Sequence, residues 1–401
     1  MKTEKNKITL MVSLCFFSYA ACYLGRNILS AFSPQLLSEK AFSSSQIGLL
    51  SGVLLLIYGF GQLISGFIGN KIKPKYMVFT GLTISGIIVM IFPFVKIFPV
   101  SVSCMILIGF ACSMLWGPIS KKVGENTTKK TGQIAMSVLT VASIFGMMLT
   151  YVAAFIGTKT KSWKLSFLYT GLFIVLNAVI WFVLEKFTPQ NDSNIKASAQ
   201  NHTEKIESEQ KIITASFIFM TIVTMLNGII RNAVSFWIPA FLSDGVGIDI
   251  SNTAIISMIS PLVNTAVTFL SLYALKYTRG DEKLMCLHLF AISTVLFVIV
   301  FFARTAVPVL AVISLFAANA LMMGACNMIF SIYILTFTKS GKLSSITGFL
   351  DFSSYISASA ASYAFSYILE YTSWNGVVLF WIISTALGFL AAAAAIKTSK
   401  C

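Results

Sequence analysis

Two arginines stand inside long apolar segments of this chain, and each begins the same short pattern. The sequence reads RNILSAFSPQLL from Arg26 and RNAVSFWIPAFL from Arg231, with six residues between the Arg-Asn pair and a proline in both copies. The copies lie 205 positions apart in a chain of 401 residues, about half its length. An arginine near the centre of a membrane helix costs about 2.5–3.5 kcal/mol, so it persists where it faces a polar cavity or a partner. The repeat therefore predicts a duplicated half and one anion site that uses both arginines.

Arginine is rare in this chain, which has 29 basic residues but only four arginines. A planar guanidinium binds phosphate or carboxylate through paired hydrogen bonds and keeps its charge in apolar surroundings. The alternatives are an internal ion pair or a side chain that extends to the membrane surface. The second is disfavoured because Arg26 and Arg231 each lie ten or more residues into their segments. We therefore expect both to bind an anionic substrate.

The composition predicts an all-α membrane protein. Hydrophobic residues make up 57% of the chain, charged residues 11%, and the mean hydropathy is +0.84, which excludes a soluble globular domain. Segments long enough to cross a bilayer core of about 30 Å predict twelve transmembrane helices. They lie near residues 8–30, 45–69, 76–97, 99–119, 131–157, 164–186, 212–240, 252–277, 284–303, 307–337, 343–369 and 375–396.

The basic residues predict the orientation. Positive charge near helix ends is retained on the cytoplasmic side, so both termini are expected there, in a multi-pass protein of the plasma (inner) membrane. That orientation places 21 basic residues inside, six outside and two within the membrane. The net charge of +15 therefore reflects topology, and nothing in the scattered lysines indicates nucleic-acid binding.

A polar segment divides the predicted helices six and six. We expect an N-terminal six-helix bundle over residues 1–187, a cytoplasmic linker over 188–211 and a C-terminal six-helix bundle over 212–401. The linker composition cannot bury a core, so it predicts disorder or a loose amphipathic helix. Two pseudo-symmetric bundles around a central site are typical of secondary transporters, which move substrate by alternating access.

Catalytic and metal chemistry is not indicated. Seven cysteines are scattered with no Cys-x-x-Cys pair, and the two histidines, His202 and His288, lie far apart. No nucleophile, base and metal can be assembled from these residues, so we expect neither an enzyme, nor a metal site, nor a cofactor.

Short motifs in both halves resemble those of known transporters. The segment Gly66–Lys71 resembles the loop motif of the major facilitator superfamily, with Asn70 in place of its usual aspartate. A closer similarity, to the organophosphate:phosphate antiporters, is carried by Tyr19–Asn27, Tyr58–Phe60, Trp116–Pro118, Arg231 and Trp374–Gly376. This resemblance implies the major facilitator fold and exchange of an organic phosphate, such as glycerol phosphate or hexose phosphate, for inorganic phosphate between two opposed arginines.

Three positions depart from the glycerol-phosphate carriers of that family. Gln62 stands where they have lysine, Ser143 where they have a histidine of the site, and Gly228 where they have tyrosine. The departures reduce the polar contacts available to a phosphate, so the resemblance leaves the choice of organic anion open.

One acidic residue, Asp351, falls well inside a predicted membrane helix. Burial raises the pKa of a carboxylate and a nearby arginine lowers it, so Asp351 could carry a proton as substrate comes and goes. It could instead be a standing countercharge for Arg231 or Arg26 in the empty carrier, and this interpretation is slightly favoured because exchange requires no titrating acid.

Further candidates are polar or aromatic residues on the faces expected to line the cavity. Tyr23 precedes Arg26 by one helical turn and can donate to a phosphate oxygen. Helix packing or a position at the membrane surface is the competing interpretation for Trp116 and Tyr355, and a bridge between helices is the competing interpretation for Asn232 and Asn327. The remaining candidates are Tyr19, Gln62, Trp116, Ser143, Asn232, Asn327 and Tyr355.

The leading function is therefore secondary transport of an organic phosphate or related small anion by a carrier that works as a monomer in the bilayer. The alternatives are a proton-coupled carboxylate or drug transporter that uses Asp351, and a transporter-like sensor of sugar phosphate.

Overall fold

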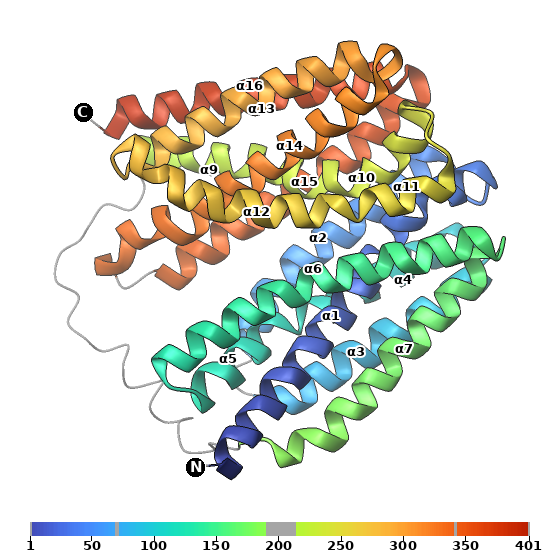
Figure 1. The fold of residues 1–401 in the computed structure, drawn as a ribbon, viewed down its shortest axis with the longest axis vertical. Coiled ribbons are helices and arrows are strands. Elements are labelled where there is room, and N and C mark those ends of the chain that lie inside the picture. Colours follow the sequence, from blue (N-terminus) through green and yellow to red (C-terminus); the bar gives the residue numbers. More distant parts are fainter. Residues whose placement is uncertain (1, 69–71, 190–213, 341–342, 400–401) are drawn as a thin grey trace. The chain divides into compact units, whose positions relative to one another are not determined.

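The computed structural model describes residues 2–68, 72–189, 214–340 and 343–399, and these segments are helical with short connections (Figure 1). In lipid every backbone polar group must be satisfied within the segment, which the α-helix achieves. The helices of the first half are α1 Lys2–Ser38, α2 Ser44–Ile68, α3 Pro74–Ile91, η1 Phe92–Phe94, α4 Phe98–Ser113, α5 Trp116–Asn126, α6 Lys129–Lys159, α7 Trp163–Leu184 and η2 Glu185–Phe187.

The second half contains long helices interrupted by shorter turns of other helix types. They are α9 Ala215–Gly228, η4 Ile229–Val234, α10 Ser235–Ala240, η5 Phe241–Gly245, α11 Ile250–Ser257, α12 Ile259–Ala274, η6 Leu275–Thr278, α13 Glu282–Ala306, α14 Pro308–Asn327, η7 Met328–Ile332, η8 Tyr333–Ser340, α15 Leu343–Tyr371 and α16 Trp374–Ser399. Three of these, η4, η5 and η7, are π-helical.

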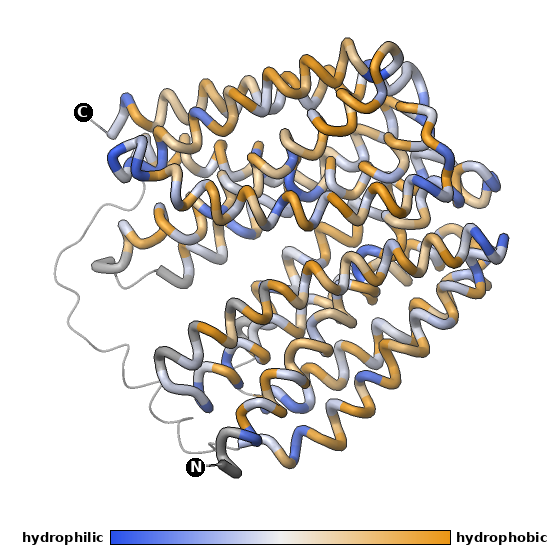
Figure 2. The backbone as a smooth tube through the Cα atoms, in the orientation of Figure 1, coloured by the Kyte–Doolittle hydropathy of each residue, from blue (hydrophilic) through white to orange (hydrophobic). Residues whose placement is uncertain are grey.

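The chain is a multi-pass integral membrane protein. Eleven helical segments of the described chain are long and apolar enough to span a membrane. The twelfth predicted span corresponds to α15, a helix of 29 residues that carries many serines together with Asp351 and falls outside that set. Hydrophobic residues cover most of each helix, and many of the hydrophilic ones lie at helix ends and in connections (Figure 2).

Most helix boundaries agree with the sequence. Phe92–Phe94 and the proline at the start of α4 separate the third and fourth segments, and Val307 and Pro308 separate α13 from α14. The fourth segment differs, because its helix ends at Ser113 and a second helix, α5, continues to Asn126.

The structure forms two compact units. One contains Met1–Phe32 and Ile57–Thr203, and the other contains Ser33–Leu56 and Glu204–Cys401. Within the first unit α3 packs against α4 and α7, and α6 against α7. Within the second, α13 packs against α14 and α16, and α9 against α15 and α16.

The segment Ser33–Leu56, which the sequence assigns to the first six helices, packs with α15 in the second unit. Ser51 and Ser362 form a buried hydroxyl pair. A Cβ at Gly48 would lie 2.3 Å from the Cβ of Ser366, and one at Gly52 would lie 3.0 Å from the carbonyl oxygen of Ser359. Only glycine therefore permits this close helix contact.

Two regions singled out in the sequence lie outside the described residues. They are residues 190–211 of the predicted linker, and Gly69, Asn70 and Lys71 of the loop motif.

Candidate functional site

Arg26 lies in the first unit, in the uninterrupted helix α1. The Cζ atom of its guanidinium is 4.1 Å from the ring centroid of Tyr58 on α2 and 5.6 Å from that of Tyr23. A cation over an aromatic face is attracted by the ring quadrupole, and more strongly where water is excluded. Two aromatic rings therefore position this half-buried guanidinium.

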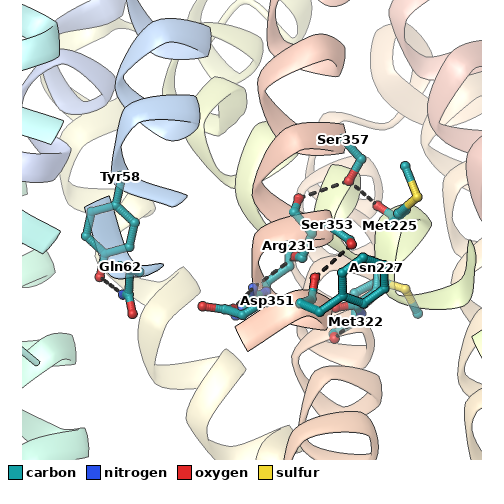
Figure 3. Close-up of polar contacts among 11 residues, drawn as sticks. Tyr58, Gln62, Met225, Asn227, Arg231, Met322, Asp351, Ser353 and Ser357 are labelled. Atoms are coloured by element: carbon teal, nitrogen blue, oxygen red, sulfur yellow. Dashed lines mark hydrogen bonds and ion pairs between the residues drawn. The ribbon is translucent and has the colours of Figure 1, made fainter. Parts of the chain in front are cut away.

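An aromatic cluster continues from Arg26 along α1. The ring of Tyr19 lies 5.1 Å from that of Tyr23 and 5.0 Å from that of Trp116 on α5. Gln62 donates a hydrogen bond of 2.8 Å from its Nε2 to the hydroxyl of Tyr58 (Figure 3). The first unit thus connects four predicted residues, Tyr19, Tyr23, Gln62 and Trp116, to Arg26 through ring contacts and one hydrogen bond.

Helix α6 crosses α1 closely beside this cluster. A Cβ at Gly146 would lie 2.3 Å from the carbonyl oxygen of Ala20 and 2.8 Å from the Cβ of Tyr23. Ser143 is half-buried on the same helix, one turn earlier. Any larger residue at position 146 would separate α6 from α1 beside Tyr23.

Arg231 lies in the second unit, in the π-helical segment η4. Its Nη2 donates to the Oγ of Ser354 on α15 at 3.1 Å. The same atom lies 3.8 Å from Oδ1 of Asp351, also on α15, and Figure 3 shows Arg231 beside Asp351. The Arg231 side chain is 15% exposed and that of Asp351 is 29% exposed. This distance is at the long end for an ion pair, so the two charges face each other without tight contact.

Aromatic rings also flank Arg231. Its Cζ lies 5.8 Å from the ring centroid of Tyr355 and 5.9 Å from that of Phe330. Each arginine of the repeat thus lies within about 6 Å of two aromatic ring centroids of its own unit. The shared chemistry is an oriented guanidinium that can accept an anion in its plane.

The departure at Gly228 has a structural reason. A Cβ at this position would lie 2.3 Å from the carbonyl oxygen of Ser354 and 2.5 Å from its Oγ. Glycine therefore lets α9 approach α15 closely, and that approach brings Ser354 to Arg231. Arg231 therefore donates to the Ser354 hydroxyl on α15, where a tyrosine on α9 would otherwise stand near it.

Two predicted asparagines differ in their surroundings. Asn327 donates from Nδ2 to the carbonyl oxygen of Thr268 at 3.3 Å and accepts from Ser331 at 2.7 Å, which joins α14 to α12. The buried Nδ2 of Asn232 has no hydrogen-bond partner within the described part of the chain. A buried amide donor without a partner is costly, so a ligand oxygen near Asn232 would be stabilised.

Residues other than the predicted ones complete the surroundings of the arginines. Tyr58, Phe330 and Ser354 contact a guanidinium directly. Asn227 donates to the carbonyl oxygen of Met322 at 2.6 Å and fixes α9 to α14 one turn before Arg231. Only Tyr58 had a sequence signal, its place in the family motif, because a serine or phenylalanine is unremarkable in an apolar helix.

The described residues contain no group of three or more His, Cys, Asp or Glu side chains placed to hold a metal ion. The candidate residues offer guanidinium, hydroxyl, amide and indole groups and one carboxylate as their polar groups.

Residues 15–362 match the family model described as Major Facilitator Superfamily. The chain is 23% identical over 425 residues to the glycerol-3-phosphate transporter of Bacillus subtilis (strain 168), covering 100% of this chain and 95% of the relative. It is 22% identical to the hexuronate transporter of the same organism, over 87% of this chain and 85% of that one. The fold is similar to that of a solved bacterial homologue of the human lysosomal transporter Spinster, with a TM-score of 0.77 at 13% identity, covering 97% of this chain and 96% of that one.

Proposed function

This chain belongs to the major facilitator superfamily and is a membrane transporter of small molecules, and from this premise we propose that it exchanges an organic phosphate for inorganic phosphate. The similarity to a glycerol-3-phosphate transporter over the full chain supports the substrate class. The observation that carries the proposal is the arginine repeat, in which Arg26 and Arg231 occupy matching sequence positions and each lies near two aromatic rings.

In the proposed mechanism both guanidiniums bind the same anion at one stage of the transport cycle. A phosphate monoester carries up to two negative charges and three oxygens, enough for two forked hydrogen-bonded pairs. Tyr23, one helical turn before Arg26, and Asn232, next to Arg231, are candidate residues that can add donors. Alternating access then exposes the bound anion to each side of the membrane in turn.

Asp351 acts as the countercharge of Arg231 when no substrate is bound. An arginine without any partner would be strongly destabilising, whereas its carboxylate partner offsets much of the cost. Because the Nη2 to Oδ1 distance is 3.8 Å, an arriving phosphate can displace the carboxylate without breaking a short forked pair. After the phosphate is released, Asp351 pairs with Arg231 again.

The same contact supports a second candidate, proton-coupled transport of a carboxylate. Asp351 would then bind a proton when substrate neutralises Arg231, and the similarity to a hexuronate transporter supports this substrate class. The two candidates differ in what drives accumulation, which is phosphate on the opposite side in one and a pH gradient in the other.

The experiment that separates them is counterflow into proteoliposomes. Vesicles loaded with phosphate should take up labelled glycerol phosphate or hexose phosphate, and vesicles loaded with chloride should not. A hexuronate added outside should leave this uptake unchanged. Uptake of hexuronate, but of no phosphate ester, driven by an inward proton gradient would replace the first proposal with the second.

We also propose a plasma-membrane location with both termini cytoplasmic, and function as a monomer. The excess of lysines in connections on one side of the predicted topology supports the orientation. Labelling of single cysteines placed in the terminal segments, in intact and opened cells, tests it.

A further inference from the structure

A cationic cavity lies in the first unit, where α3 begins and where α5 and α7 end. Its volume is about 300 Å³. The charged side chains that line it are Lys73, Lys75, Lys122, Glu125, Glu185 and Lys186. Four lysines and two glutamates leave an excess of two positive charges, and none of these residues belongs to the arginine sites.

Three of the residues that line the cavity, Lys75, Lys122 and Glu185, form a charge cluster. Lys122 and Glu185, each 4% exposed, form a direct salt bridge, and Lys75 Nζ lies 3.9 Å from the other carboxylate oxygen of Glu185. Trp181 donates from its indole to the carbonyl oxygen of Lys75 at 3.1 Å, which fixes α3 against α7. The negative charge of Glu185 is thus shared between two lysines, and the cavity remains cationic.

Exposed aromatic side chains stand beside the cavity on the same helix ends. Tyr76 is 52% exposed, Phe182 38% and Phe187 54%. Lys75 Nζ lies 4.4 Å from the ring centroid of Phe182, and Lys186 Nζ lies 5.0 Å from that of Phe187. Lysines that rest on aromatic rings at the end of a membrane helix are typical of the headgroup level of a bilayer.

We propose that this cavity binds the phosphate group of an anionic phospholipid. Lys73, Lys75 and Lys186 attract the phosphodiester, and the exposed rings of Tyr76 and Phe182 receive the first part of an acyl chain. The orientation proposed above places this cavity on the cytoplasmic side, where basic pockets between membrane helices bind lipid headgroups of this kind. A soluble phosphate could use the same lysines, but it has no use for the aromatic surface beside them.

The test uses purified full-length protein in a neutral detergent and compares Lys75→Gln/Lys186→Gln with a matched control. The control is Lys159→Gln/Lys164→Gln, which removes the same charge from two exposed lysines that also lie over aromatic rings, those of Phe155 and Trp163. The midpoint of thermal unfolding is followed while short-chain phosphatidylglycerol, phosphatidylcholine or inorganic phosphate is added. A ligand that binds only the folded protein raises this midpoint.

Phosphatidylglycerol should stabilise the wild type and the control at similar concentrations, and phosphatidylcholine should have no comparable effect. At about 1 kcal/mol for each lysine, the Lys75→Gln/Lys186→Gln protein should require about 30-fold more phosphatidylglycerol. An equal response of this variant and the control would overturn the proposal.

The titration with inorganic phosphate shows whether the bound anion is a lipid headgroup or a soluble phosphate. It is measured in an Arg26→Lys/Arg231→Lys background, so that failure of the arginine sites cannot be confused with failure of this cavity. The lipid proposal expects phosphate to stabilise this background equally with and without Lys75 and Lys186. If phosphate needs those two lysines and phosphatidylglycerol does not, the cavity is a site for the soluble anion and the lipid assignment is wrong.

Discussion

At the scale of single residues, we expect that a positive charge alone cannot replace either of the two repeated arginines in transport. Arg26→Lys and Arg231→Lys keep the positive charge but lose the fork that binds two oxygens at once. Loss of a charge-assisted hydrogen bond costs about 1.5–3 kcal/mol, so we expect phosphate exchange to fall by about 10–100-fold or more in each variant.

The measurement is uptake of labelled organic phosphate into phosphate-loaded proteoliposomes, normalised to the amount of inserted protein. Arg279→Lys is the control, because Arg279 is exposed in the connection before α13. Near wild-type exchange by either Arg26→Lys or Arg231→Lys, with normal insertion, would make that arginine a structural residue.

Asp351 is the residue that decides between a countercharge and a proton carrier. Asp351→Asn keeps the size of the side chain and removes both its charge and its titration. If Asp351 balances Arg231, the variant should bind phosphate with altered affinity and unfold at a lower temperature, while the pH dependence of exchange stays that of the wild type. The measurement is equilibrium exchange at equal pH on both sides, followed by uptake under an imposed pH gradient. Loss of gradient-driven accumulation alone would identify a proton carrier.

At the scale of helices, the contact of α9 with α15 places Ser354 beside Arg231. Gly228→Ala puts a methyl group 2.3 Å from a backbone oxygen, which cannot move as a flexible side chain can. Overpacking of this kind costs about 1–3 kcal/mol, and the shift of α15 should also weaken substrate binding. We expect a lower unfolding midpoint and a higher half-saturating phosphate concentration.

Gly124→Ala is the matched control for this change. It lies in α5 with no atom within 4 Å of the added Cβ, so alanine there should be neutral or stabilise the helix by up to about 1 kcal/mol. If Gly228→Ala behaved in the same way, the close contact would not position Ser354.

The helices were largely predictable, because long apolar segments bounded by Pro, Gly and Lys have few alternatives in a membrane. The π-helical turns were not, since no residue type in Ile229–Val234 or Met328–Ile332 marks them. Arg26 and Arg231 could be named as candidate anion-binding residues, because each is a charged residue in an apolar segment. Ser354 was not, because its role depends on how closely α15 approaches Gly228, and such distances are set by packing.

At the scale of the whole molecule, alternating access requires some helix contacts to be made in one state and broken in another. The hydroxyls of Ser51 and Ser362 join α2 to α15. Gly48 and Gly52 of α2 pack closely against α15 on either side of this contact. Small residues let the two helix backbones approach closely here, so cysteines at these two positions can reach each other. We therefore expect Ser51→Cys/Ser362→Cys to form a disulfide on mild oxidation and to stop exchange.

Exchange is measured before oxidation, after oxidation and after reduction, and cross-linking is followed by mass spectrometry of alkylated peptides. Each single variant is the control for oxidation of the native cysteines, five of which are buried among those the structure describes. Reduction should restore the activity of the double variant. Full exchange by a completely cross-linked protein would show that this contact persists throughout the cycle.

The π-helical turns give the two halves unequal geometry for equal sequence spacing. Both copies of the repeat place proline eight residues after arginine, yet Pro34 follows along α1 and Pro239 follows a π-helical segment. A π-helical turn closes over one residue more than an α-helical turn, so it absorbs a residue without lengthening the helix equally. The second copy has therefore kept the spacing of arginine and proline, while the π-helical segment changes the direction around the helix axis in which the later side chains point. A duplicated gene can in this way acquire an asymmetric binding site with no insertion or deletion in the motif itself.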